Sequence, residues 1–167
     1  MTDHAQIEQK LSGLGIVLPE PPKPVASYLP CVISDDLVII SGQLPFKGGK
    51  IEFCGKVPRD LSMEDGQEAA RLAVINGLAV LKTMALDGNW SRLSKILRLG
   101  VFVQSTDDFY SQPQIANGAS DLLVDIFGDL GRHARAAIGV NALPLNAAVE
   151  VELMAKIAPQ RRWRDHR

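Results

Sequence analysis

The sequence is poor in cysteine and histidine, and this shortage excludes the common metal-bound folds. Its two cysteines, Cys31 and Cys54, form no C-x-x-C pair, and no histidine is spaced with them as a zinc finger requires. We therefore expect two buried thiols and no metal site.

Long apolar runs and an excess of positive charge are also missing. No run approaches the roughly 18 apolar residues of a membrane span, and the start, MTDHAQIEQKLSG, lacks the apolar core of a secretory signal. We therefore expect a cytoplasmic protein without a membrane partner. A net charge of −1 argues against a broad nucleic-acid footprint. With 167 residues, 46% of them apolar, the chain fits one globular domain.

Apolar periodicity, helix caps and turn residues predict an alternation of strands and helices. A capping box at Ser62 and Asp65 opens the longest helix, and Asp35-Asp36 joins two strands as a hairpin. In chain order the predicted elements are a helix at 2–15, a proline-rich connector at 18–27, strands at 28–34 and 37–45, a glycine-rich excursion at 46–58 with one short strand, a helix from 62 to about 86, a strand at 93–105, a helix from 111 or 113 to 128, and strands at 134–140 and 149–157.

This order predicts an α+β domain in which both long helices cover one face of a single sheet. The last strand alternates apolar residues with Glu150, Glu152, Met154 and Lys156, so its second face is polar but not uniformly charged. We expect another subunit to cover that face.

Arg135 and Glu150 are the first candidates for a site. If the last two strands form a hairpin with Val140 near Val149, Arg135 and Glu150 share a face, roughly 13 Å apart at ~3.3 Å per residue. An arginine grips a carboxylate with two parallel hydrogen bonds, and a nearby glutamate can orient or deprotonate water. That pair would suit hydrolysis of a small anionic substrate. The alternative is an exposed ion pair on a polar sheet face, contributing about 0–1 kcal/mol and no catalysis.

Three blocks of the sequence resemble a known family in order and spacing. They are LVIISGQLP, RLGVFVQSTDDF after an alanine-rich helix, and HARAAIGVNALPLNAAVEVELMA. The motifs S-G-Q-x-P and A-R…L-P…V-E-x-E resemble those of the RidA/YjgF reactive-intermediate deaminase family, many of whose members are named endoribonuclease L-PSP. The resemblance covers roughly residues 25–158.

The resemblance implies a chorismate-mutase-like fold of the bacillary type, with a mixed sheet and two helices packed on one face. It also implies a homotrimer with ligand clefts between neighbouring subunits. Studied members hydrolyse reactive 2-imino and enamino acids to 2-oxo acids and ammonia, without cofactor or metal. The expected partners are therefore a small carboxylate substrate and two further copies of the chain.

By this resemblance Arg135 matches the arginine that binds the substrate carboxylate, and Glu150 matches the glutamate that positions the attacking water. The matching positions for substrate binding are Tyr28, Ser41, Gly42, Asn117 and Ala137. Ser120 competes with Asn117 for the position of the helix asparagine.

The chain also departs from the family pattern. Ala137 stands where many members carry cysteine, and His133 stands where the usual P-A-R has proline. His133 either has a structural role at a turn or lines the cleft. Residues 1–24 and the basic tail 159–167 lie outside the common core, which indicates a divergent, longer branch.

Two other functions stay open from the sequence. The same cleft could bind a small carboxylate in a non-catalytic or regulatory trimer. An RNA-cleaving activity, as the older family name suggests, is opposed by the near-neutral charge and the lack of a paired set of histidines.

Overall fold

The main sheet has five strands, in the order β1-β2-β7-β5-β6. The computed structural model describes residues 3–21 and 27–158; the predicted tail at 159–167 and part of the connector lie outside these ranges. The strands of the sheet are β1 Cys31–Ser34, β2 Leu37–Gln43, β5 Leu93–Gln104, β6 Ala134–Val140 and β7 Val149–Ile157. A separate two-stranded ribbon consists of β3 Phe46–Lys47 and β4 Lys50–Ile51.

The predicted hairpin at Asp35-Asp36 is confirmed. β1 and β2 are antiparallel with Ser34 opposite Leu37, and Asp35 has a φ of 54°, a left-handed conformation that aspartate tolerates in turns. β2 then pairs with β7, and its register shifts between Ile40 and Gln43. This bulge contains the Ser41-Gly42 pair of the S-G-Q motif.

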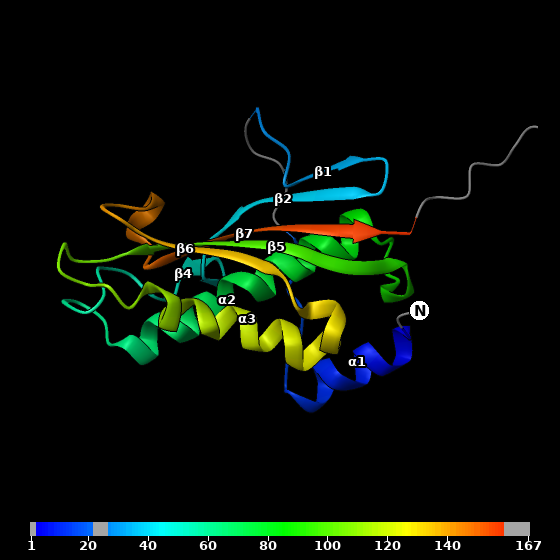
Figure 1. Cartoon of the computed structure of the whole chain (residues 1–167), viewed down its shortest axis with the longest axis horizontal. Coiled ribbons are helices and arrows are strands. Elements are labelled where there is room, and N and C mark those ends of the chain that lie inside the picture. The colour runs from blue at the N-terminus through cyan, green and yellow to red at the C-terminus, as the bar shows by residue number, and fades with distance from the viewer. Residues whose placement is uncertain (1–2, 22–26, 159–167) are drawn as a thin grey trace, which may run out of the picture.

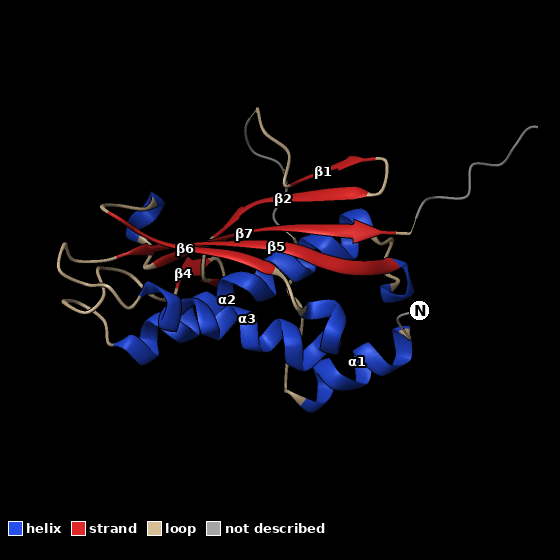
Figure 2. Cartoon of the chain, in the orientation of Figure 1, coloured by secondary structure: helices blue, strands red, loops and turns tan. Residues whose placement is uncertain are grey.

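Two long helices cover one face of the sheet, as the sequence predicts, while the other face is open (Figure 1, Figure 2). α2 spans Met63–Val80 and continues as a π turn, Leu81–Ala85; α3 spans Gln112–Phe127 and ends in a short 3-10 turn, Gly128–Gly131. The Ser62–Asp65 capping box is formed in full. The α+β class with a mixed sheet is therefore confirmed.

The last two strands do not form the predicted hairpin. β5 lies between them: it pairs in parallel with β6 and antiparallel with β7. β5, α3 and β6 form a strand–helix–strand crossover, the usual connection between parallel neighbours. The prediction was wrong because alternation defines the two faces of a strand without saying which strand lies beside it.

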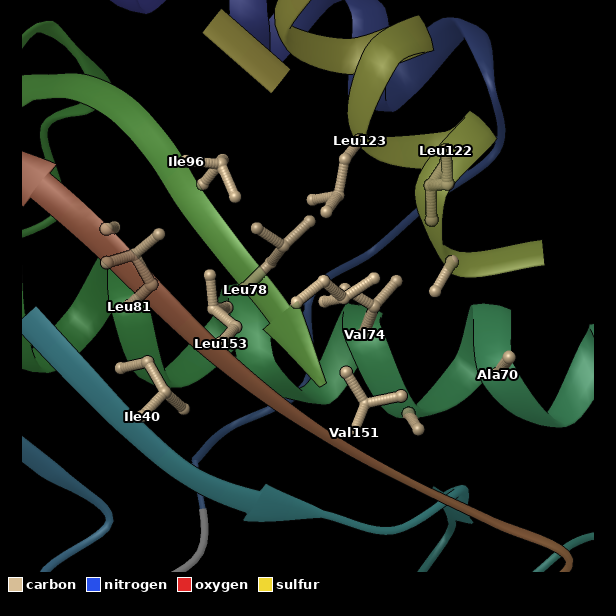
Figure 3. Packing of buried hydrophobic residues seen from close by; sticks show 14 of the residues in the cluster. Ile40, Ala70, Val74, Leu78, Leu81, Ile96, Leu122, Leu123, Val151 and Leu153 are labelled. Atoms are coloured by element: carbon tan, nitrogen blue, oxygen red, sulfur yellow. The ribbon is translucent and has the colours of Figure 1, made fainter. Parts of the chain in front are cut away.

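The core fills the space between the sheet and the two helices. Figure 3 shows Val74, Leu78 and Leu81 of the α2 segment against Ile40, Val151 and Leu153 of the sheet, all buried. α3 packs so closely on α2 that a Cβ on Gly118 would lie 2.1 Å from the backbone oxygen of Gln67. Glycine at this position therefore sets the distance between the helices.

The N-terminal helix α1, His4–Gly13, packs onto this domain. It buries Ile7 and Leu11, and Glu8 Oε1 accepts a hydrogen bond from Trp90 Nε1 at 2.7 Å and pairs with Lys82 Nζ at 2.6 Å. The predicted helix is thus present and is anchored to a fully buried tryptophan.

The two thiols differ in exposure. Cys31 is half-buried, and burial raises the pKa of its thiol. Cys54 is exposed, so the prediction of a buried thiol is wrong there; it lies in the irregular segment between β4 and α2, outside the core. Across residues 3–21 and 27–158, no helix is long and apolar enough to cross a membrane.

Candidate active site

Arg135 lies on β6, the edge strand of the sheet, and α3 holds its guanidinium. Nη1 donates hydrogen bonds to Asn117 Oδ1 at 2.8 Å and to Ser120 Oγ at 3.1 Å. Asn117 and Ser120 are three positions apart on one helix and therefore face the same way. The sequence left these two residues as alternatives, and the structure brings both to Arg135.

The strand beyond Arg135 carries small residues along the same face. Ala137 is half-buried, and Gly139 is exposed beside the first turn of α3. A polar hollow of about 260 Å³ adjoins Gly139, with Ser105, Tyr110 and Gln112 in its lining. The edge that presents Arg135 thus continues into a space of metabolite size.

Glu150 lies on the opposite, open face of the sheet. The neighbours of Glu150 in β7, Val149 and Val151, are buried under the helices, so Glu150 points the other way. Its carboxylate covers Gly42, where a Cβ would lie 1.8 Å from Oε1. The bulge in β2 and the missing side chain of Gly42 together make room for this carboxylate.

Arg135 and Glu150 therefore do not share a face within one chain, contrary to the sequence prediction. Arg135 is in register with Leu99, which is in register with Leu153, and both leucines are buried under the helices. Glu150 is in register with Phe102 on the other side. The prediction of a shared face was wrong because β6 and β7 are not direct neighbours: β5 lies between them.

Glu152 has a separate partner on the open face. Arg98 Nη1 lies 2.6 Å from Glu152 Oε1, an ion pair that the sequence analysis did not predict although Arg98 has the matching parity in β5. No described residue donates a hydrogen bond to Glu150. Burial raises the pKa of Glu150, and the charge of Glu152 raises it further. The raised pKa makes Glu150 a stronger base than an ordinary glutamate.

Ser41 and Gly42, two of the predicted substrate-binding residues, lie on the side of Glu150. Ser41 Oγ donates to the carbonyl of Leu29 at 2.7 Å and so ties β2 to the segment that follows Tyr28. Tyr28 itself is 59% exposed. Six of the predicted residues therefore form two groups on opposite faces: Arg135, Asn117 and Ala137 with the helices, and Glu150, Gly42 and Ser41 on the open side.

His133, for which the sequence left two roles open, belongs to the Arg135 group. Its Nε2 lies 3.0 Å from Ser120 Oγ, and its Nδ1 lies 2.5 Å from the carbonyl oxygen of Gly131. The sequence analysis considered His133 and Ser120 separately and missed that they form one network. Ser120 lies on a helix and His133 just before a strand, and nothing in the sequence indicates that these two positions are in contact.

Other features of the described chain do not suit a small anion. A cavity of about 320 Å³ between the residues 19–21 and the β3–β4 ribbon is lined mostly by apolar atoms and has Glu20 as its charged residue. Within the described ranges, no three acidic, histidine or cysteine side chains gather as metal ligands would. Arg135 and Glu150 therefore remain the groups best suited to chemistry.

Comparisons with known proteins agree with this fold. Residues 8–157 match the family described as "YjgF/chorismate mutase-like, putative endoribonuclease". Protein TCP17 of Trypanosoma cruzi is 37% identical over 153 residues, which are 91% of this chain and 94% of TCP17. The crystal structure of Atu1372 from Agrobacterium tumefaciens, of unknown function, is 41% identical with a TM-score of 0.87 over 93% of this chain and 94% of Atu1372.

A more distant structure shares the fold. Escherichia coli TdcF, crystallised with bound serine, is 21% identical with a TM-score of 0.59 over 83% of this chain and 94% of TdcF. The family match covers most of the chain, and TCP17 and Atu1372 are 37% and 41% identical to it over nearly their whole lengths. The chain belongs to the YjgF/chorismate mutase-like family.

Proposed function

We propose that the chain hydrolyses small 2-imino or 2-enamino acids to 2-oxo acids and ammonia. The observation that carries this proposal is the hydrogen bonding of Arg135. Nη1 donates to Asn117 and Ser120, while no described residue accepts a hydrogen bond from Nε or Nη2. An exposed, oriented guanidinium with one free edge is suited to a carboxylate.

The reaction would take place between two subunits of a homotrimer. Arg135 and Glu150 lie on opposite faces of one sheet, so a cleft that contains both needs Arg135 from one chain and Glu150 from its neighbour. The open face also exposes Val32, Ile39 and Ile138 by 45–48%, and β6 is an edge strand of the sheet. Burying such a surface against further copies would stabilise the assembly.

The chemistry needs only groups of the chain and water. With the carboxylate fixed by Arg135, a water molecule adds to the protonated imine: the water oxygen bonds to the imine carbon while Glu150 accepts one of the water protons, giving a carbinolamine. Glu150 returns this proton to the nitrogen. The C–N bond then breaks as the carbinolamine hydroxyl gives its proton back to Glu150 and becomes the carbonyl, so that ammonia and the 2-oxo acid leave, and Glu150 loses the proton to ammonia or solvent. The raised pKa of Glu150 favours this exchange because a stronger carboxylate base accepts the proton more readily.

The substrate class is supported by a relative. TdcF is reported with bound serine, a small amino acid whose carboxylate and α-nitrogen resemble those of a 2-imino acid. The hollow of about 260 Å³ beside Gly139, farther along β6 from Arg135, would take a short side chain.

The test is an assay in which an amino-acid oxidase generates the imine in situ and 2-oxo acid formation is followed. We expect Arg135→Ala to lower kcat/KM on the order of 100-fold through lost orientation. Glu150→Gln should lower kcat on the order of 100-fold with little change in ligand binding.

Matched controls are available nearby. Arg132 is an exposed arginine paired with Asp129, and Glu68 is exposed on α2. Arg132→Ala and Glu68→Gln should keep full activity. Wild-type rates in Arg135→Ala or Glu150→Gln would refute the assigned roles.

The departures at Ala137 and His133 permit one alternative, a trimer that binds a small carboxylate without turning it over. Calorimetry with 2-oxobutanoate distinguishes the two. Saturable binding that depends on Arg135, together with no accelerated loss of imines, would establish the binding protein in place of the enzyme.

A further inference from the structure

Arg135 and three side chains around it form a continuous hydrogen-bonded network. It runs from the Gly131 carbonyl through His133 and Ser120 to Arg135, and Asn117 completes it. Ser120 and His133 are half-buried, whereas the guanidinium is exposed. The network therefore connects a partly enclosed histidine to the proposed carboxylate-binding group.

The direction of each hydrogen bond follows from the chemistry of its groups. A carbonyl oxygen only accepts, so His133 Nδ1, 2.5 Å from the Gly131 oxygen, carries the hydrogen. In the neutral imidazole Nε2 is then an acceptor, and the Ser120 hydroxyl donates to it. The lone pairs of Ser120 Oγ are thereby left for Arg135 Nη1.

This direction has a consequence for Arg135. Nη1 has two hydrogens, and Asn117 Oδ1 and Ser120 Oγ accept both. The guanidinium plane is held from one side, which leaves the Nε–Nη2 edge for two parallel bonds to a carboxylate. A lysine could not be held in this way because it lacks the planar fork.

We infer that His133 and Ser120 are positioning residues for Arg135: they orient the guanidinium so that its Nε–Nη2 edge receives the substrate carboxylate. The inference rests on the proposed function, since it takes Arg135 as the carboxylate-binding group. It adds two residues at positions where the family pattern gave no such roles.

Proton binding at His133 is coupled to the same site. The charged groups acting on the ring are Lys95 on β5 and Arg135 on β6, the strand that begins just after His133; from α3 the ring meets the neutral Ser120. Burial lowers the pKa of His133, and those two positive charges lower it further, although the Gly131 bond opposes them. A bound carboxylate offsets the positive charge and raises this pKa again. Ligand binding therefore takes up a proton and becomes tighter as the pH falls through the pKa of His133 in the complex.

The first experiment measures Kd for 2-oxobutanoate by calorimetry from about pH 5.5 to 8. At about pH 8, where the imidazole is neutral, Ser120→Ala and His133→Gln should each weaken binding about fivefold, with the double variant no weaker than either single one. In a Glu150→Gln background, where the raised pKa of Glu150 no longer contributes, His133→Gln should also abolish the pH dependence. Ser111→Ala, at the start of α3 without a side-chain cap bond, is the matched control and should change nothing.

Three results would overturn the inference. The first is a double variant in which the losses of affinity of the two single variants multiply. The second is a pH dependence of Kd that survives in His133→Gln in the Glu150→Gln background. The third is unchanged binding in Ser120→Ala. A merely structural role would not produce the coupled pattern. If the activity assay detects no turnover, only the deaminase proposal is contradicted, because the Kd measurements require binding and not catalysis.

A second readout needs no ligand. Nitrogen-15 NMR of the Arg135 guanidinium should show slowed rotation of Nη1 in the wild type and faster rotation in both variants. If 2-oxobutanoate does not bind, the proposed function is contradicted, but NMR still measures whether His133 and Ser120 hold the Arg135 guanidinium. Free rotation in the wild type would refute the positioning itself.

Discussion

The carboxyl group of Glu150 is held in surroundings that disfavour its charge. It is half-buried, receives no hydrogen bond from a described residue, and lies near Glu152. These features cost stability when Glu150 is ionised but make it a better base. Function and stability are therefore opposed at this position.

A substitution at Gly42 tests how closely this carboxylate is fitted. In Gly42→Ala the new Cβ would lie 1.8 Å from Glu150 Oε1, so the carboxylate must turn away. Because the displaced atom is the end of a flexible side chain, we expect the free energy of unfolding to change by less than about 1 kcal/mol. Activity should fall on the order of 10-fold or more.

The control for that substitution is Gly13→Ala at the end of α1, where a Cβ meets nothing within 4 Å. Kinetics and chemical denaturation of both variants are the measurements. Full activity in Gly42→Ala would mean that Glu150 need not occupy the observed position.

Removing the charge of Glu150 should therefore stabilise the fold, by an amount that depends on pH. The ordinary pKa of a glutamate is 4.5, and that of Glu150 is raised above it. The folded state then binds the proton more tightly than the unfolded state, so a penalty appears as pH rises through 4.5 and is complete above the raised pKa. Glu150→Gln should therefore be more stable than wild type near pH 7.5.

This gain should disappear near pH 4, below the ordinary pKa, where Glu150 is protonated in both states. Denaturant titrations at fixed protein concentration measure it, since association adds to apparent stability. A stability difference that does not depend on pH would contradict the assigned cause.

Among the helices and strands, local signals were reliable and pairing was not. The Ser62–Asp65 capping box and the Asp35-Asp36 turn were predicted correctly, because each depends on contacts between near neighbours in the chain. The position of β5 between β6 and β7 depends on contacts between distant residues. Apolar alternation carries no information on those contacts.

The same limit applies to the site. Arg135, Asn117 and Ser120 meet because α3 packs over β6, and the sequence had already marked all three as candidates. Their grouping with His133, and the separation of Arg135 from Glu150, follow from tertiary packing. Sequence reasoning could therefore name the residues but could not assign them to faces.

The N-terminal helix is an integral part of the fold. Burial raises the pKa of Glu8, but hydrogen bonds from Lys82 and Trp90 outweigh it, so the net shift is downward. Glu8→Ala leaves the Trp90 N–H without its partner. We expect a loss of about 1 kcal/mol in the free energy of unfolding, discounted for the exposure of Glu8.

Gln9→Ala, exposed on the same helix, is the matched control and should change stability little. Because the pKa of Glu8 is lowered, its contribution is present above the ordinary value of 4.5 and is lost as pH falls below it. Denaturation at pH 7 and pH 3.5 checks this. Equal stability of Glu8→Ala and wild type at pH 7 would show that the anchor is dispensable.

The complete protein is proposed to be an assembly in which no subunit has a whole site. One chain presents Arg135 on its helix-covered face at an edge strand and Glu150 on its open face. Val32, Ile39 and Ile138 give the open face an apolar character that further copies would cover. Each subunit would then supply half of two different clefts.

Subunit complementation measures this sharing directly. Arg135→Ala and Glu150→Gln chains, each inactive alone, are co-expressed at equal levels, and imine hydrolysis by the mixed trimers is measured. Half of the clefts receive an intact arginine, and half of those receive an intact glutamate, so activity should recover to about a quarter of wild type. No recovery in the mixed trimers, with wild type active, would show that the two residues do not meet across a subunit boundary.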